Sequence, residues 1–151
     1  MDTVARPAVP DLARSLVGRV LCNHRLVTEL GSGGMGHVFY AEHLVIGRRA
    51  AIKVLKPEVS RDETVVARFL NEARAVNEIR HPNVIEITDI GREADLHYIV
   101  MNFLEGETLG ERIERDKIID EDTVLRMTRQ VVSALSAAHQ RGIIHRDLKP
   151  D

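Results

Sequence analysis

Six residues at 31–36 (GSGGMG) carry glycines in the spacing G-x-G-x-x-G. Glycines let backbone N–H groups approach phosphate oxygens because no Cβ stands in the way. The spacing alone is also compatible with a glycine-rich hairpin that binds nothing and with a dinucleotide site. A dinucleotide site needs a helix directly after the third glycine, whereas the next residues, 37–40 (HVFY), favour a strand. We therefore set the dinucleotide site aside.

A lysine and a glutamate form a candidate ion pair. Lys53 lies inside an apolar run that favours a strand, where most lysines face solvent on an edge. Glu72 comes three residues after Phe69, four before Val76 and seven after Val65, so helical spacing directs its carboxylate along the buried face. A buried carboxylate is costly unless it is paired. We predict that Lys53 is its partner; a Glu72 at the helix edge that reaches solvent is the alternative.

The string HRDLKP at 145–150 is the third candidate. Taken one by one, these residues are typical of a charged surface turn. As a string they match the H-R-D-L opening of a catalytic loop, and two other motifs precede them in the chain. Val38 extends the glycine loop to G-x-G-x-x-G-x-V, and the tripeptide A-I-K ends at Lys53.

Period-two patterns and turn residues predict the strands that position these motifs, at 26–30, 37–43, 48–55, 84–90 and 96–103, with a polar turn around Gly91. Helical spacing predicts a helix over 62–79 that Asp62 caps, and a short helix near Thr108. A long helix over 120–140 is apolar around about half its circumference, so it needs cover on more than one side. Residues 1–20 read as a loosely ordered arm.

Composition excludes several classes. Lysine and arginine number 21 against 23 aspartate and glutamate, a net charge of −2, so we expect no nucleic-acid partner. No stretch approaches the ~18 apolar residues of a membrane span, and the start of the chain does not read as a secretory signal. The single cysteine, Cys22, suits a reducing compartment. We expect this segment to be cytoplasmic.

Because of these three motifs, the sequence over about residues 20 to 151 resembles a eukaryotic-type protein kinase of the bacterial serine/threonine branch. The resemblance implies an α+β, protein-kinase-like fold. Its N-lobe would hold a five-stranded antiparallel sheet and one αC-type helix, followed by the first helices of a truncated helical C-lobe. The implied division is a flexible arm at 1–20, the N-lobe and hinge at 21–104, and the start of the C-lobe at 105–151.

The resemblance also implies phosphoryl transfer from Mg-ATP to serine and threonine hydroxyls of protein substrates, in signal transduction. Asp147 would accept the hydroxyl proton, and Lys149 would add positive charge near the transferred phosphate. Lys53 would contact the α- and β-phosphates and pair with Glu72. The residues that it implies for nucleotide binding, besides Lys53, are Leu30, Gly31, Ser32, Gly33, Gly34, Met35, Gly36, His37, Val38, Ala51, Met101 and Leu104.

The chain stops at Asp151, and the family places its magnesium ligands, an asparagine and the aspartate of D-F-G, after this position. No D-F-G occurs in the 151 residues, so we expect no metal ligand here. Two hypotheses remain open. The chain is the N-terminal part of a serine/threonine kinase, inactive by itself, or it is a non-catalytic nucleotide-binding or interaction module.

Overall fold

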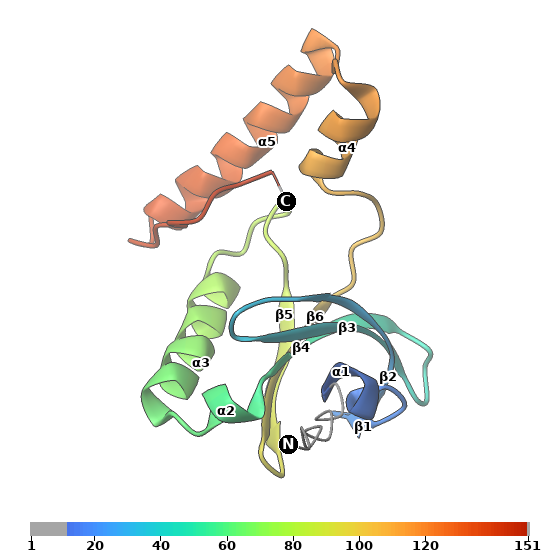
Figure 1. The fold of residues 1–151 in the computed structure, drawn as a ribbon. Helices are drawn as coiled ribbons and strands as arrows, with labels where there is room; N and C mark the ends of the chain where they lie inside the picture. Colours follow the sequence, from blue (N-terminus) through green and yellow to red (C-terminus); the bar gives the residue numbers. More distant parts are fainter. Residues whose placement is uncertain (1–11, 151) are drawn as a thin grey trace, which may run out of the picture.

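The computed structural model describes residues 12–150, and its centre is one antiparallel sheet (Figure 1). The strands pair in the order β1-β2-β3-β4-β6-β5. Their bounds are β1 Val20–Leu21, β2 His24–Ser32, β3 Gly36–His43, β4 Arg49–Leu55, β5 Ile87–Glu93 and β6 Leu96–Asn102. The α+β fold is confirmed, but the sheet has six strands rather than five. The additional strand, β1, has two residues and is too short to leave a periodic pattern.

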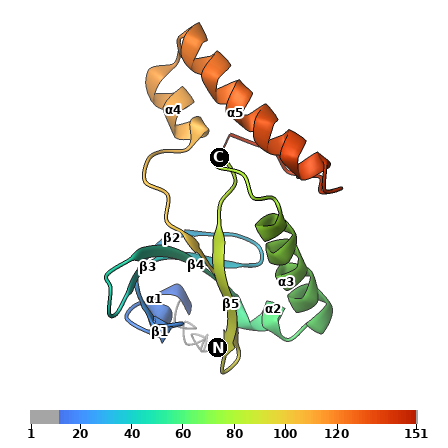
Figure 2. The same ribbon diagram turned by 180° about the vertical axis from the view of Figure 1, so that it is seen from behind.

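Five helices complete the described part of the chain: α1 Leu12–Leu16, α2 Pro57–Ser60, α3 Glu63–Glu78, α4 Leu109–Asp116 and α5 Glu121–His139. Helices α2 and α3 lie beside the sheet, whereas α4 and α5 form a separate helical pair beyond its end (Figures 1 and 2). No helix in residues 12–150 combines the length and the apolar character needed to cross a membrane.

The predicted helix starts are confirmed by capping contacts. The Asp62 carboxylate accepts hydrogen bonds from the N–H groups of Thr64 and Val65 at 2.9 and 3.3 Å. At the start of α4, Thr108 and Glu111 form a reciprocal capping box. Such caps satisfy the first N–H groups of a helix, which have no partner within it. Capping residues are local sequence signals, so the sequence predicted the starts of these helices to within one residue.

The amino-terminal segment differs from its prediction. Residues 1–11 lie outside the described part of the chain, but residues 12–16 form α1 instead of a loose arm. Ala13 and Leu16 of this helix are buried in the same cluster as Leu21 and Leu26. A five-residue helix has too few turns to show a periodic pattern, and its order comes from the core against which it packs.

The predicted turn around Gly91 is wrong. β5 begins at Ile87, three residues later than expected, and continues through Gly91, and the chain turns after Glu93 with Ala94 at φ +52°. Gly91 pairs with Tyr98 in the register of β5 and β6. A Cβ at position 91 would overlap the Tyr98 ring. The glycine therefore makes room for an aromatic side chain rather than marking a turn.

The sheet is covered differently on its two faces. Leu26, Phe39, Ile52 and Val54 belong to one core, together with α1. On the other face, α3 covers Leu55 and Ile99 with Phe69 and Ala73. Because α3 covers only part of this second face, the part near β2 and β3 stays open.

Helix α5 has apolar side chains on its surface, as its sequence pattern predicts. Val124, Leu125, Val131 and Val132 are exposed, and Val132 keeps 57% of its surface.

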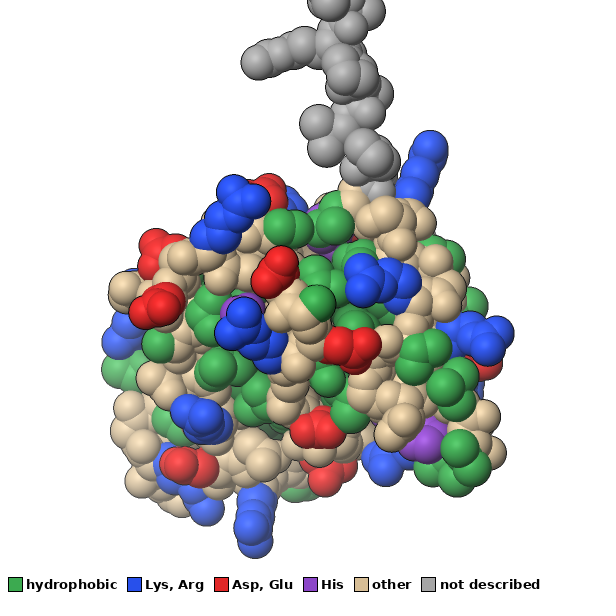
Figure 3. Space-filling model, turned by 90° about the horizontal axis from the view of Figure 1, so that it is seen from below, with side chains coloured by type: hydrophobic (Ala, Val, Ile, Leu, Met, Phe, Trp, Pro, Cys, Tyr) green, Lys and Arg blue, Asp and Glu red, His purple; other side chains and the backbone are tan. Residues whose placement is uncertain are grey.

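On the face of the molecule that Figure 3 shows, acidic and basic side chains are interspersed with hydrophobic ones, and neither charge forms a patch of its own.

Gly36 provides a test of the fold. A Cβ at this position would overlap the Val54 carbonyl oxygen of the neighbouring strand, whereas a Cβ at Gly33 would meet nothing within 4 Å. We expect Gly36→Ala to lower the free energy of unfolding by about 1–3 kcal/mol, the usual cost of overpacking. Gly33→Ala, the matched control, should stay within ~0.5 kcal/mol of the wild type. Urea unfolding followed by circular dichroism measures both, and equal losses would contradict the packing described.

Candidate active site

The glycine loop connects β2 and β3. The strand pairing extends into the motif, because Gly31 pairs with Val38 and Ser32 pairs with His37. The turn is therefore shorter than the six residues 31–36 that the predicted strands left unpaired. The Gly33 N–H donates to the Gly36 carbonyl at 2.9 Å and closes the turn. The Lys56 N–H donates to the Met35 carbonyl at 3.0 Å. This second bond ties the tip of the loop to the end of β4.

Three glycines of the loop have no explanation within the described chain. Gly31, Gly33 and Gly34 are not at positive φ, and a Cβ at any of them would meet no atom within 4 Å. Neither backbone conformation nor packing therefore requires glycine here. The absence of side chains leaves the backbone of the loop accessible, which is the condition for a close approach by a ligand.

Val38, Ala51, Lys53 and Met101 are brought together on one face of the sheet. Val38 pairs with Lys53, and Ala51 pairs with Met101, across strands β3, β4 and β6. Directly paired residues of antiparallel strands point to the same face, and residues two apart along a strand do so as well. These four side chains therefore form one surface that continues from the glycine loop toward the end of β6.

Lys53 is half-buried on this surface and lies against helix α3. Its Nζ atom is 5.7 Å from the centroid of the Phe69 ring, within the range of a cation–π contact. A lysine in this place is not the solvent-facing edge residue that is usual for strands, because β4 is flanked by β3 and β6. The positive charge therefore faces the open part of the second face.

The predicted burial and pairing of Glu72 are wrong for this structure. Glu72 is exposed, and no ion pair joins it to Lys53. The buried stripe of α3 contains Phe69 and Ala73, with Val66 and Leu70 packed beside them. The prediction assumed that the face with Val65, Phe69 and Val76 is buried. The observed buried stripe is rotated away from that face around the helix axis, so Glu72 lies at the edge of the stripe. The alternative weighed from the sequence, a glutamate that reaches solvent, is the one observed.

The His37 ring does not face the surface that Val38 and Lys53 form. The ring is buried beside Phe39, at a centroid distance of 6.3 Å, and so lies on the sheet face opposite Val38. Its Nδ1 atom is 2.7 Å from a carboxylate oxygen of Glu29 on β2. This contact braces the two strands that carry the glycine loop.

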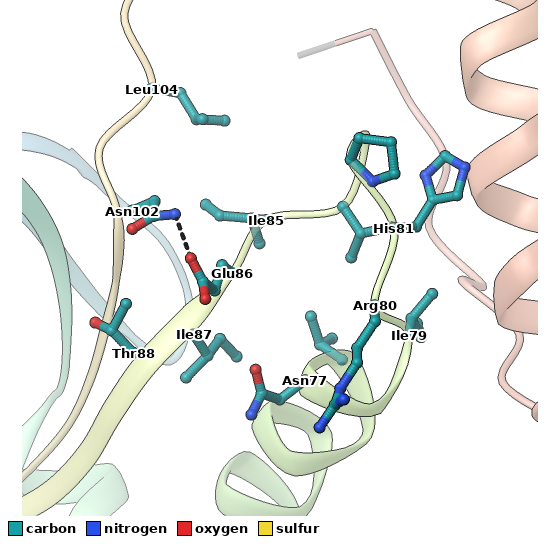
Figure 4. Close-up of a pocket in the computed structure, with 13 residues that line it drawn as sticks. Asn77, Ile79, Arg80, His81, Ile85, Glu86, Ile87, Thr88, Asn102 and Leu104 are labelled. Carbon is teal, nitrogen blue, oxygen red and sulfur yellow. Dashed lines mark hydrogen bonds between the residues drawn. The ribbon is translucent and has the colours of Figure 1, made fainter.

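The end of β6, where the following segment 103–105 begins, is held by contacts on both sides. The Asn102 N–H donates to the Glu86 carbonyl at 3.0 Å, and the Asn102 amide donates to the Glu86 carboxylate at 2.8 Å, as the dashed line in Figure 4 shows. Arg48 donates to the Asn102 side-chain oxygen at 2.9 Å. Asn102 is thus fixed between the β3–β4 hairpin and β5.

A groove of about 720 Å³ lies between the end of α3, the start of β5 and this segment (Figure 4). Arg80, His81 and Glu86 line it with several aliphatic side chains. Leu104, which is 69% exposed, also lines it and is the single predicted nucleotide-binding residue that does. The groove is therefore a different place from the surface that Lys53 and Ala51 form.

The HRDLKP string follows α5 as an extended segment. Gly142, at φ +71°, follows the end of the helix, and Arg146 adopts φ +64°, which is uncommon for a residue with a side chain. Asp147 keeps 80% of its side-chain surface, and the Lys149 Nζ lies 3.9 Å from its carboxylate. The Gly110 N–H donates to the Pro150 carbonyl at 2.7 Å. This bond holds the segment against the start of α4.

The helical pair also contacts the sheet unit near the end of α3. His81 Nε2 lies 2.9 Å from the Ser133 hydroxyl of α5. Among the described residues, no group of three histidine, cysteine, aspartate or glutamate side chains is arranged to hold a metal ion.

Two aromatic side chains lie near the site; Tyr40 was not predicted as a site residue, and Phe103 was expected there only as part of the hinge that the resemblance implies. Tyr40 pairs with Ala51, and its ring lies 4.9 Å from that of Phe103, at an interplanar angle of 62°. The available signal was the period-two spacing from Val38 to Tyr40, which places both side chains on one face of β3. Phe103 is two residues after Met101 by the same spacing.

Comparisons with known proteins agree with the motifs. Residues 24–151 match the family model described as "Protein kinase domain". The chain is 38% identical over 136 residues to the serine/threonine-protein kinase PrkC of Bacillus subtilis, covering 89% of this chain and 21% of that protein. It is 44% identical over 136 residues to the serine/threonine-protein kinase Pkn1 of Myxococcus xanthus, covering 90% of this chain and 19% of that protein. The chain thus spans about a fifth of the length of these relatives.

The fold has solved counterparts as well. The crystal structure of the Mycobacterium tuberculosis PknI kinase domain superposes with a TM-score of 0.72 and 29% sequence identity. The alignment covers 89% of this chain and 55% of that domain.

The orientation of α3 generates a prediction about stability. Phe69 is buried against the sheet and beneath the Lys53 amine, whereas Glu72 is exposed and unpaired with Lys53. We expect Phe69→Ala to lower the free energy of unfolding by about 3–5 kcal/mol. Glu72→Ala should change it by less than ~0.5 kcal/mol. Urea titration of both variants measures this, and a large loss for Glu72→Ala would indicate a buried ion pair instead.

Proposed function

Because this chain belongs to the protein kinase domain family, we propose that it forms the ATP-binding part of a serine/threonine protein kinase. The observation that carries the proposal is the open glycine loop. Gly31, Gly33 and Gly34 are required neither by φ nor by packing, and Lys53 lies on the sheet face that continues from the loop. A bound triphosphate explains both features at once, since it needs exposed N–H donors and a positive charge.

In this proposal the nucleotide lies along the open face of the sheet. The backbone of residues 31–36 covers the phosphates, and the Lys53 ammonium neutralises part of their charge. Val38, Ala51 and Met101 provide an apolar surface for the adenine base, and Leu30 and Leu104 extend it at the two ends. Peptide groups of residues 103 and 104 are available to hydrogen-bond the base. The bracing of Asn102 by Arg48 and Glu86 supports this role, because it fixes the backbone of that segment.

The chemical step assigned to the HRDLKP string is transfer of the γ-phosphoryl group to a serine or threonine hydroxyl. The hydroxyl oxygen forms a bond to the γ-phosphorus while the bond to the β,γ-bridging oxygen breaks, and ADP leaves. Asp147 accepts the hydroxyl proton, and Lys149 adds positive charge near the transferred group. The exposure of Asp147 supports this role, since a substrate protein must reach its carboxylate.

Protein kinases use Mg²⁺ together with ATP, and the partners proposed here are ATP and protein substrates. The described residues bring no metal-binding group together, so no step proposed for this chain depends on a metal that it holds. A cytoplasmic position for this segment completes the proposal. It is supported by the requirement for ATP and by the free thiol of Cys22.

A second candidate function is nucleotide binding without catalysis. One observation favours it: the Lys53 ammonium faces Phe69 and has no acidic partner on α3. In protein kinases the corresponding lysine–glutamate pair must be in place for transfer.

Calorimetric titration of the chain with ATP tests the nucleotide site. Lys53→Met removes the charge that faces the phosphates, and Gly33→Ala places a methyl group on the open loop. We expect each variant to bind ATP at least about tenfold more weakly, a loss of about 1.4 kcal/mol. Lys117→Met, which removes an exposed charge at the end of α4, is the matched control and should bind like the wild type. No ATP binding by the wild-type chain would overturn the proposal.

Phosphate transfer tests the catalytic role and separates the two candidate functions. In the protein as encoded by its complete gene, Asp147→Asn should abolish transfer from radiolabelled ATP to a protein substrate, because the amide accepts no proton. ATP affinity should remain within about twofold. Asp122→Asn on the exposed first turn of α5 is the control and should leave transfer intact. Binding of ATP without transfer by the wild type would favour the non-catalytic module.

A further inference from the structure

We infer that Tyr40 is a base-contacting residue and that its ring, held by Phe103 and Glu42, forms the outer wall of the adenine pocket. The inference rests on the proposed function and adds to that site a residue that the motifs do not include. Its starting point is the arrangement of side chains in two rows on the open face of the sheet.

The register of the sheet defines both rows. The first row contains Val38, Lys53 and Ile99, which are paired across β3, β4 and β6. The second row contains Tyr40, Ala51 and Met101, paired across the same strands. The first row holds the lysine that faces the phosphates. The second row is two residues farther from the glycine loop along β3, which is where the base of the same nucleotide extends.

The second row has its smallest side chain in the middle, and that residue, Ala51, keeps 7% of its surface exposed. Ala51 is small and lies at the centre, between a tyrosine on one side and a methionine on the other. Neighbouring side chains across a sheet are close enough to touch, about 4.5–5.5 Å between Cβ atoms. A planar base on Ala51 would therefore be bounded by Met101 on one side and by the Tyr40 ring on the other. Tyr40 is only partly buried, so part of its surface remains accessible for such a contact.

The Tyr40 ring is held in place by two contacts. It meets the Phe103 ring edge-to-face at 4.9 Å, a favourable geometry for aromatic pairs. Its hydroxyl donates to the Glu42 carboxylate at 2.6 Å. This hydrogen bond raises the pKa of Tyr40 above its ordinary value. A ring fixed in this way loses little freedom when a ligand packs against it.

The segment that carries Phe103 is fixed to the same edge of the sheet. Arg49 at the start of β4 forms an ion pair with Glu105, and Arg48 donates to Asn102. Phe103 lies between these two anchored positions. The contact between Phe103 and Tyr40 is therefore part of a clamp that joins the β3–β4 hairpin to the segment after β6. The wall formed by Tyr40 is positioned by that clamp.

The chain is suited to a direct measurement, because it contains two tyrosines and no tryptophan. Tyr98 belongs to the core on the opposite face of the sheet. With ring-labelled tyrosine, two sets of ring signals arise in the NMR spectrum, and Tyr98→Phe assigns them. We expect ATP to shift the Tyr40 signals and to give nuclear Overhauser contacts with the adenine protons. Inorganic tripolyphosphate, which has no base, should leave the Tyr40 signals unchanged.

Affinity provides the second measurement. Tyr40→Leu removes the aromatic wall, and we expect it to weaken ATP binding about tenfold while the binding of tripolyphosphate is unchanged. Tyr40→Phe keeps the ring and should stay within about twofold of the wild type, so the inference remains testable if Tyr40→Leu fails to fold. Tyr98→Phe is the control variant on the other face.

The outcomes separate this inference from the proposed function. Base-specific shifts of Tyr40 and a loss of ATP affinity in Tyr40→Leu support it. ATP binding that depends on Lys53 but leaves the Tyr40 signals unchanged would overturn the role of Tyr40 and leave the nucleotide site standing. No ATP binding at all would overturn both.

Discussion

The site depends on strand β4, which lies between β3 and β6 and has buried residues on both faces of the sheet. Its even-numbered positions from Ala50 to Val54 enter the core beneath α1, and its odd-numbered positions form the opposite face. A strand with two covered faces has no free side for a charged residue. Lys53 is tolerated because its part of the second face is left open by α3. The same constraint makes the position suitable for a charged ligand group.

Helix α3 decides how much of that face is open. Its buried stripe packs Phe69 and Ala73 on Leu55 and Ile99, and this contact brings the Phe69 ring beneath the Lys53 amine. Glu72 then falls at the edge of the helix. The structure thus stabilises the helix through apolar packing and leaves the lysine with an aromatic neighbour in place of an acid. A partly desolvated ammonium that has no acidic partner among residues 12–150 interacts strongly with an incoming phosphate.

Two devices give the open face its boundaries. At one end, the exposed backbone of the glycine loop is held in shape by the bond between Lys56 and Met35 and by the contact between His37 and Glu29. At the other end, Asn102, Phe103 and Glu105 are attached to the β3–β4 hairpin. Apart from the contact between His37 and Glu29, these contacts join segments that are far apart in the sequence. These contacts make both ends of the open face rigid, while the glycines leave the backbone of the loop accessible.

The sequence by itself determined the features that depend on a few consecutive residues. The Asp62 cap, the strands around Lys53 and the order of the motifs are local patterns with a direct physical cause. The family followed from those motifs. Tertiary structure decided the features that depend on which surfaces meet. Gly91 fits beneath Tyr98, and α1 is ordered by its core. The packing of Phe69 turns Glu72 outward, and the register of three strands places Tyr40 beside Ala51. Each of these depends on packing between distant segments, which no local pattern in the sequence encodes.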